Sequence, residues 1–193
     1  MGRVYDDVAI VTGASRGLGE ICARALANQG ALLVLMSRSK GKLELIRNSL
    51  KCPENHSIIS VDLTDTKALH QAVNEAVKFL KVVDVVLHIA GGGLGLKDPL
   101  LSSDEFFKLF NLNVAAAVEI NRIIVPKMIQ RNTGNLVHVC SIASSEATGS
   151  VGYNTVKAAL AAYVRTLGRE IAGSGIVATG ILPGGFYAPG NSW

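Results

Sequence analysis

The sequence predicts a three-layer α/β/α protein, built on a doubly wound parallel sheet with helices on both faces. Short, mostly apolar, β-branched runs alternate regularly with longer helical patterns along the 193 residues. Hydrophobic residues make up 49% of the chain and aromatic residues only 5%, a composition typical of a tightly packed α/β core. A glycine-rich turn directly follows the first apolar run. Together these features predict parallel strands joined by right-handed helical crossovers.

Six runs are predicted as strands, and most are continuously apolar, as strands covered on both faces should be. They are residues 8–12, 32–37, 57–61, 82–89, 135–140 and 176–182. Helices are predicted over residues 17–29, 40–50, 65–79, 104–131 and 152–171. Thr64 and Asp65 supply a capping signal for the third of these helices. Because no linker, repeat or change of composition interrupts the pattern, we expect residues 1–193 to form a single nucleotide-binding domain.

The charge pattern argues against several classes of partner. The net charge is +4, and the Lys and Arg residues are scattered rather than gathered into a basic run. We therefore expect no nucleic-acid partner and no polybasic membrane anchor. No segment has the unbroken apolar stretch that a membrane span needs. The histidines lack metal-ligand spacing, so no metal site is predicted; they are His56, His70, His88 and His138.

Cysteine usage and the first residues point to the cytoplasm. Cys22, Cys52 and Cys140 are widely spaced and form no CxxC pair, as expected in a reducing compartment. Cys140 is expected to be a buried, unreactive thiol. The opening MGRVYDDVAI lacks the charged start and long apolar stretch of a signal peptide. A cytoplasmic protein is the expectation.

The turn TGASRGLG, residues 12–19, has the context of a phosphate-binding loop. It lies between the first predicted strand and the first predicted helix. Gly13, Gly17 and Gly19 allow a tight turn and a close approach to a pyrophosphate. The helix that follows would offer free N–H groups and the positive end of its dipole. The alternative is an ordinary strand-to-helix turn.

The end of the second predicted strand indicates the cofactor. An acidic residue there would bind ribose hydroxyls and favour NAD(H), but the chain has Ser37 and Arg38. Arg38 could pair with a 2′-phosphate, with Arg16 flanking the same group, which favours NADP(H) while leaving NAD(H) possible. The alternative is two surface arginines with no ligand. Asp62 is placed either to accept a hydrogen bond from an adenine amino group or to cap a helix, and both interpretations stay open.

A second set of residues has the pattern of an acid–base site. Tyr153 and Lys157 are four residues apart and would share one helix face, with Ser141 upstream at a strand end. A nearby ammonium stabilises phenolate, so the tyrosine could exchange a proton with a substrate oxygen near neutral pH. The serine hydroxyl could hold the same oxygen. A solvated helix face is the alternative.

These motifs resemble those of the short-chain dehydrogenase/reductase family. TGASRGLG is similar to its TGxxxGxG motif and YNTVK to its YxxxK motif. VHVCSIAS, FNLNVAAA and LPGG resemble its serine, asparagine and Pro-Gly segments, in the family's order. The resemblance covers nearly the whole chain and implies a Rossmann-type fold of the single-domain branch. It also implies an NAD(P)-dependent enzyme acting on CH–OH or C=O groups.

Carried over by position, the resemblance implies a catalytic tetrad of Asn113, Ser141, Tyr153 and Lys157. Asn113 would hold a water linked to Lys157, and Lys157 would also bind the nicotinamide ribose. Without the resemblance, Asn113 would be taken as an ordinary polar helix residue. The cofactor-binding residues expected are Gly13, Ser15, Arg16, Gly17, Leu18, Gly19, Ser37, Arg38, Asp62, Leu63, Ala90, Gly91, Tyr153, Lys157, Pro183 and Gly184.

Three departures from the family pattern bear on function. HIAG, residues 88–91, stands where the family has NNAG, and His88 is interpreted as a tolerated change at a strand end. Ser144 and Ser145 are alternatives to Ser141, which is preferred because it directly follows a strand. Family members continue past the position of Trp193, so we expect the usual C-terminal segment that contacts substrate to be absent.

The sequence therefore supports more than one function. The leading hypothesis is an oxidoreductase that moves hydride between NADP(H) and a small carbonyl or secondary alcohol. The alternatives are a nucleotide-binding relative without turnover and a fragment of a longer active enzyme. By resemblance, the apolar faces of the two long helices would pair copies into a homodimer or homotetramer.

Overall fold

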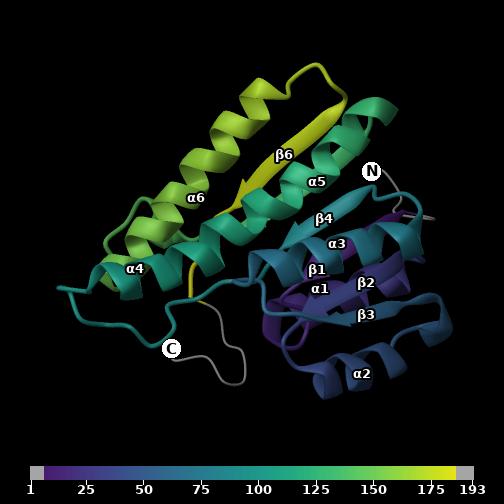
Figure 1. Cartoon of the computed structure of the whole chain (residues 1–193), viewed down its shortest axis with the longest axis horizontal. Helices are drawn as coiled ribbons and strands as arrows, with labels where there is room; N and C mark the ends of the chain where they lie inside the picture. The colour runs from purple at the N-terminus through teal and green to yellow at the C-terminus, as the bar shows by residue number, and fades with distance from the viewer. Residues whose placement is uncertain (1–6, 186–193) are drawn as a thin grey trace.

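The computed structural model describes residues 7–185 as a six-stranded parallel sheet with helices on both faces (Figure 1). The strand order is β3-β2-β1-β4-β5-β6, and every neighbouring pair is parallel. The strands are β1 Val8–Thr12, β2 Leu32–Ser37, β3 Ser57–Ser60, β4 Val85–His88, β5 Gly134–Val139 and β6 Ile176–Ile181. The order reverses between β1 and β4, which confirms the predicted doubly wound sheet and its three layers.

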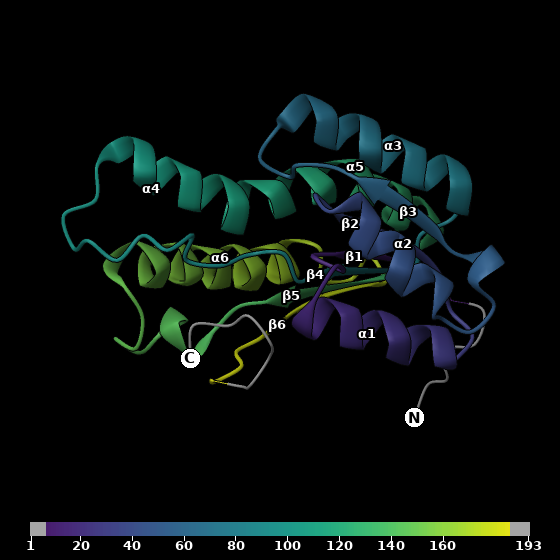
Figure 2. The same ribbon diagram turned by 90° about the horizontal axis from the view of Figure 1, so that it is seen from below.

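The helices pack on both faces because successive strand residues point to opposite sides. The helices are α1 Gly17–Asn28, α2 Lys40–Asn48, α3 Thr66–Leu80, α4 Ser103–Phe110, α5 Ala116–Arg131 and α6 Val151–Glu170. Ala9 and Val11 of β1 join the core beneath α1 and α2, whereas Val8 and Ile10 join the core beneath α3 and α5. Figure 2 shows α1 below the sheet and α3 and α5 above it.

The fourth predicted strand, 82–89, is too long: β4 spans only Val85–His88. Pairing with β1 begins at Val85, which lies opposite Ala9. At the other end, the N–H of Ile89 donates to the Thr12 side chain instead of to a neighbouring strand. The strands β1 and β2 match the predicted bounds, and the other strand and helix boundaries differ from the predictions by at most two residues.

The single helix predicted over 104–131 is wrong in one respect. The helical run has a wide π-type turn, Asn111–Ala115, between α4 and α5. The Asn113 side chain takes the carbonyl of Leu109 as its own hydrogen-bond acceptor, which competes with the regular helical ladder. The run Ser103–Arg131 is long and apolar enough to cross a membrane, but half of its most apolar window is buried within the protein.

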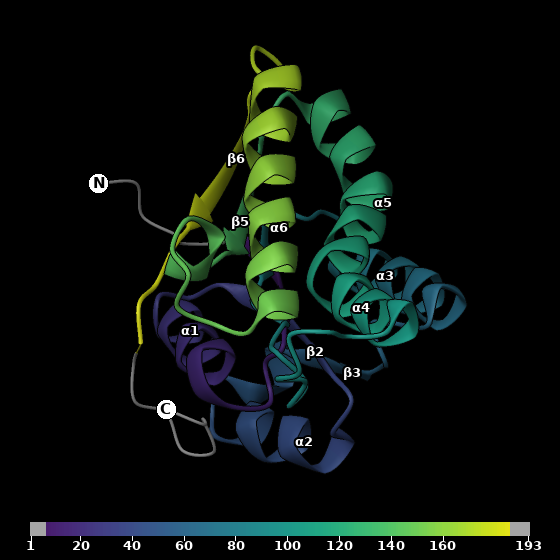
Figure 3. The same ribbon diagram turned by 90° about the vertical axis from the view of Figure 1, so that its left-hand side faces the viewer.

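The two faces of β6 differ in how they are covered. Helix α6 lies along β5 and β6 (Figure 3), and Ala178 and Gly180 pack toward its residues Gly168 and Val164. On the opposite face, Val177 and Ile181 are 53% and 46% exposed. The outer part of the sheet is thus covered on one side only by the described residues.

Candidate active site

The predicted site residues gather at the carboxyl ends of β1, β4 and β5, where the strand order reverses. In open α/β sheets this edge forms the crevice in which ligands bind. The start of α1, the π-type turn and the first half of α6 border the same edge.

The glycines of the first turn are required by its geometry. Gly13 has φ +69°, and a Cβ there would lie 2.8 Å from the backbone nitrogen of Ala90. A Cβ on Gly19 would collide with the carbonyl of Gly13. The N–H groups of Gly17 and Leu18 lie in the first turn of α1, where no acceptor is available within the helix. The turn therefore offers free donors and close backbone approach to an anionic group.

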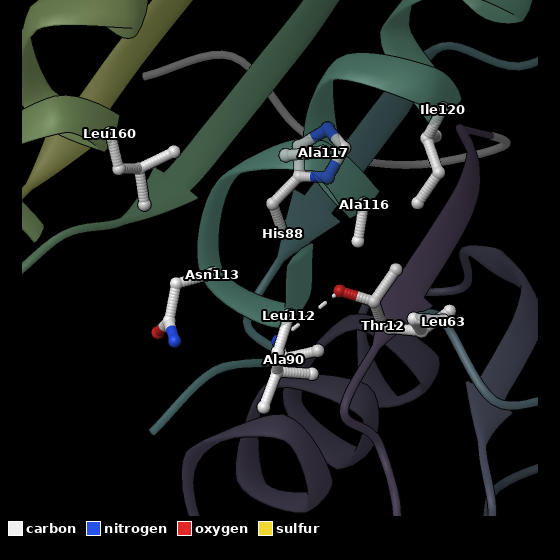
Figure 4. Close-up of a pocket in the computed structure, with 10 residues that line it drawn as sticks. All are labelled: Thr12, Leu63, His88, Ala90, Leu112, Asn113, Ala116, Ala117, Ile120 and Leu160. Carbon is white, nitrogen blue, oxygen red and sulfur yellow. Dashed lines mark hydrogen bonds between the residues drawn. The ribbon is translucent and has the colours of Figure 1, made fainter. Parts of the chain in front are cut away.

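Thr12 is a structural member of the site that the sequence analysis did not single out. Its Oγ1 accepts hydrogen bonds from the N–H groups of Ile89 (3.1 Å) and Ala90 (3.2 Å) and donates to the carbonyl of Leu87 (3.3 Å). Figure 4 shows the Thr12 and Ala90 bond at the edge of a small cavity that Leu63, His88 and Asn113 also line. Thr12 thereby fixes the loop after β4 against the end of β1.

The residues near the end of β2 are available to a ligand. Arg16 and Arg38 are exposed, and neither makes an ion pair with the residues the structure describes. Ser37 is buried, and its Oγ accepts from the N–H of Ser39. Both guanidinium groups are thus exposed at the turn and after the second strand, with the charge of Arg38 also helping to lower the pKa of Asp62.

Asp62 has a local role in the structure. Its Oδ1 accepts hydrogen bonds from the backbone N–H (2.9 Å) and the hydroxyl (2.8 Å) of Thr64. These bonds lower the pKa of the Asp62 carboxyl. Asp65 is the residue that caps α3, accepting from the N–H of Ala68. The interpretation of Asp62 as a helix cap is therefore wrong, since it closes a local turn instead, and the adenine contact stays a prediction.

Asn113 is buried, and its amide joins the π-type turn to the loop after β4. Its Nδ2 donates to the carbonyl of Gly92 (3.0 Å), and its Oδ1 accepts from the N–H of the same residue (3.0 Å). A Cβ on Gly91 would lie 2.8 Å from Asn113 Oδ1 and 3.1 Å from Lys157 Nζ. Only a glycine at 91 therefore lets this loop pass between the asparagine and the lysine.

Lys157 lies on α6 four residues after Tyr153, and its ammonium group is held near the tyrosine ring. Its Nζ donates to the carbonyl of Val139 (2.9 Å) and lies 5.7 Å from the centre of the Tyr153 ring. The lysine is only 3% exposed, and burial lowers its pKa to about 8. The half-buried Tyr153 has no hydrogen-bond partner for its hydroxyl among residues 7–185. The phenol is thus free to meet a substrate oxygen.

Among the three candidate serines, Ser141 is the one whose hydroxyl proton is uncommitted. Its Oγ accepts from the N–H of Ala143 (3.1 Å) and donates to no described residue. Ser144 donates its hydroxyl to the carbonyl of Lys157 (2.9 Å), and Ser145 is exposed.

The Pro183–Gly184 segment lies beside this serine loop. The carbonyl of Pro183 accepts from the N–H of Ile142 at 3.1 Å, and a Cβ on Gly184 would lie 3.9 Å from the Ile142 side chain. The structure thus brings the Pro-Gly segment to the edge that carries Ser141.

Comparison with known proteins identifies the family. A family model described as short chain dehydrogenase matches residues 7–192. The chain belongs to this family. Short-chain dehydrogenases/reductases are oxidoreductases that use NAD(P)(H), so the chain is an enzyme of this class.

Individual relatives agree with the family. An uncharacterized oxidoreductase of Staphylococcus aureus (strain USA300) is 31% identical over 185 residues, which are 95% of this chain and 80% of that protein. A similar oxidoreductase of Staphylococcus epidermidis (strain ATCC 12228 / FDA PCI 1200) is 28% identical over the same shares of each chain. Among solved structures, L-sorbose reductase from Gluconobacter frateurii, complexed with NADPH and L-sorbose, has a TM-score of 0.89 at 28% identity. That match covers 96% of this chain and 72% of the reductase.

Proposed function

We propose that this short-chain dehydrogenase/reductase moves hydride between NADP(H) and a carbonyl or secondary alcohol, with Tyr153 as the general acid and base. The observation that carries the proposal is the meeting of Asn113, Lys157 and Tyr153 around the loop at Gly91. An isolated YxxxK pair on a helix surface would leave the lysine in solvent. Here the lysine is buried, bonded to a strand carbonyl and adjacent to the asparagine.

The first turn and the second strand are proposed to hold the cofactor. The N–H groups of Gly17 and Leu18 at the start of α1 would bind its pyrophosphate, where a side chain on Gly13 or Gly19 would leave no room. Arg38 and Arg16 would pair with a 2′-phosphate, which is why we propose NADP(H) over NAD(H). The backbone of Ala90 and Gly91 and the Pro183–Gly184 segment would border the nicotinamide. The NADPH bound to the sorbose reductase relative supports this preference.

The cofactor, when bound, supplies or accepts the hydride at the substrate carbon. Tyr153 gives the substrate oxygen a proton during reduction and takes it back during oxidation. Ser141 donates its uncommitted hydroxyl hydrogen to the same oxygen and so orients it. Lys157 stabilises the phenolate form of Tyr153 by its charge. Asn113 holds the Gly92 backbone, and with it the loop that lies between the lysine and the crevice.

Isotope transfer tests the proposal. NADPH carrying deuterium at C4, in each of its two stereochemical forms, is incubated with the protein and a panel of aldehydes, ketones and ketoses that includes L-sorbose. The expected result is an alcohol with one deuterium at the former carbonyl carbon, from one of the two forms only. Tight NADPH binding with no transfer to any compound would instead favour a nucleotide-binding relative without turnover.

Three further features are proposed. The chain acts as one nucleotide-binding domain in the cytoplasm. Copies associate through α4, α5 and α6, where Phe107, Ile129 and Val151 expose 60%, 47% and 54% of their surface. A homodimer or homotetramer, detected by light scattering, is the expected state.

A further inference from the structure

Four polar residues form a hydrogen-bonded cluster in the core behind the site. They are His88 at the end of β4, Asn121 on α5, His138 on β5 and Tyr163 on α6. The first three are at most 5% exposed. The two imidazole rings are stacked, with centres 4.4 Å apart and planes 13° from parallel. We call these four residues the Asn121 cluster.

The central amide uses its oxygen for one neighbour and its nitrogen for the other two. Asn121 Oδ1 lies 2.8 Å from His88 Nε2, and its Nδ2 lies 3.1 Å from His138 Nε2 and 3.0 Å from the Tyr163 hydroxyl. The Asn121 side chain thus links α5 to one residue on β4, one on β5 and one on α6. Replacing it breaks three contacts between four elements.

The carbonyl of Thr179 fixes the orientation of the amide. This carbonyl, 3.4 Å from His138 Nδ1, can only accept, so Nδ1 carries the hydrogen and Nε2 is an acceptor. Nε2 must therefore face the amide N–H₂ rather than the amide oxygen. The Asn121 oxygen then faces His88, whose Nε2 donates. Burial lowers the pKa of both histidines, so they are neutral and suited to these roles.

Each element joined by the cluster carries part of the proposed site. His88 precedes Gly91 by three residues, and His138 precedes Ser141 by three. Asn121 follows Asn113 by eight residues along the same helical run. Tyr163 lies on α6 with Tyr153 and Lys157. In the described structure, Asn121 therefore hydrogen-bonds its own helical run to the other three elements that carry the site, which are β4, β5 and α6.

The π-type turn gives this connection a mechanical role. The wide turn separates α4 from α5, and Asn113 lies within it. The Gly92 bonds hold the turn at the site, while α5 beyond it is held by apolar packing and by Asn121. Asn121, the sixth residue of α5, adds hydrogen bonds to β4, β5 and α6. A change there would rotate α5 and shift Asn113 relative to Lys157.

We propose that Asn121 is a positioning residue for the catalytic tetrad, acting through the cluster and not by contact with substrate. This inference rests on the proposed function for the identity of the tetrad. Misplacement of a catalytic group by a fraction of an ångström lowers turnover sharply. The side chains of the cluster make none of their hydrogen bonds to the phosphate-binding turn. Loss of the amide should therefore lower kcat and spare NADPH affinity.

The test compares Asn121→Leu with Ile124→Ala, a control on the same helix. Ile124 is 1% exposed, belongs to the apolar core and has no polar group that could join the cluster's hydrogen bonds, so its truncation is expected to lower the melting temperature by cavity formation. Asn121→Leu is expected to lower kcat by about 10- to 100-fold with an unchanged NADPH dissociation constant. Ile124→Ala is expected to keep kcat although it is less stable. If the two variants have the same kcat once the difference between their melting temperatures is taken into account, the proposal is overturned.

A second readout does not depend on turnover. The N–H of Gly92 is bonded to Asn113 Oδ1, so its hydrogen exchange, followed by NMR, reports the position of Asn113. Hydrogen exchange at the Gly92 N–H is expected to be faster in Asn121→Leu than in the wild type. In Ile124→Ala it is expected to change only by the amount that the lower overall stability of that variant accounts for. If the wild-type protein shows no turnover, the proposed function fails while this measurement still decides the positioning role.

A milder variant covers the case in which Asn121→Leu does not fold. Tyr163→Phe removes only the hydroxyl that accepts from Asn121 and keeps the ring against His138. It is expected to change kcat and Gly92 exchange in the same direction and by less. Wild-type values for both would contradict the proposal.

Discussion

The two halves of the sheet bury different chemistry. In the half formed by β1, β2 and β3 the core is mostly apolar: Leu33 and Leu35 of β2 are fully buried, and the buried polar side chains are Thr12, Ser37 and His56. The half formed by β4, β5 and β6 buries amides, imidazoles and an ammonium group. These buried polar residues are His88, Asn113, Asn121, His138, Ser141 and Lys157.

The difference reflects two kinds of task. Holding a phosphate needs backbone N–H groups and a rigid support, which an apolar core and glycines provide. Moving a proton needs side chains at fixed positions, and their burial costs stability unless each is hydrogen-bonded. No buried side-chain nitrogen or oxygen in the described part of the chain lacks a partner, so the second half meets this requirement. We interpret the first half as the cofactor support and the second as the reacting half.

Loss of the Tyr153 hydroxyl should separate the two halves most strongly. Tyr153→Phe is expected to lower turnover by about 10²- to 10⁴-fold, because general acid–base catalysis contributes that much. NADPH affinity should stay at the wild-type value, measured by fluorescence titration. Thr155→Val, an exposed change on the same helix, is the control and should keep full activity. Turnover by Tyr153→Phe equal to that of the control would remove Tyr153 from the mechanism.

Acid should destabilise the reacting half through its two buried histidines. Burial lowers the pKa of His138 from 6.5 to about 4, and that of His88 lies well below its usual value. The unfolded chain binds protons below pH 6.5 that the folded protein does not, so stability is full above this pH and falls toward pH 4. His138 alone accounts for about 3 kcal/mol of this loss.

Chemical denaturation at a series of pH values measures the effect. In His138→Asn the fall in unfolding free energy between pH 6.5 and pH 4 should shrink by about 3 kcal/mol, since one of the two titrating groups is gone. Stability curves of the two proteins that run parallel through this range would show that His138 is not held neutral.

The same division explains what the sequence could predict. The strands and helices of the first half follow from apolar patterns and the glycine turn, and helix α1, predicted over 17–29, is observed at Gly17–Asn28. The single helical run predicted over 104–131 is observed, but the prediction missed its π-type turn, where Asn113 bonds both to Leu109 and to Gly92, 21 residues earlier. No periodicity within the helix reports such a contact.

The polar core was hidden for a similar reason. His88 looked like a tolerated change at a strand end, but it bonds to Asn121, 33 residues away, and stacks on His138. In the sequence, Thr12 is only the first residue of the TGASRGLG motif, although its hydroxyl hydrogen-bonds the end of β1 to the backbone after β4. A side chain whose partners are far away in the sequence leaves no pattern among its neighbouring residues. Tyr153 and Lys157 are only four residues apart, so their pattern is visible in the sequence.

The central claim, that the first half binds NADP(H) through its arginines, is tested most directly by calorimetric titration with NADPH and NADH. The proteins are the wild type, Arg38→Ala and the control Lys40→Ala, which removes another exposed cation near the same strand. The account predicts that NADPH binds more tightly than NADH and that Arg38→Ala weakens NADPH binding by about tenfold, the worth of a charge-assisted hydrogen bond. NADH binding and the control should be unchanged. Equal losses for both cofactors in Arg38→Ala, or equal affinities in the wild type, would contradict it.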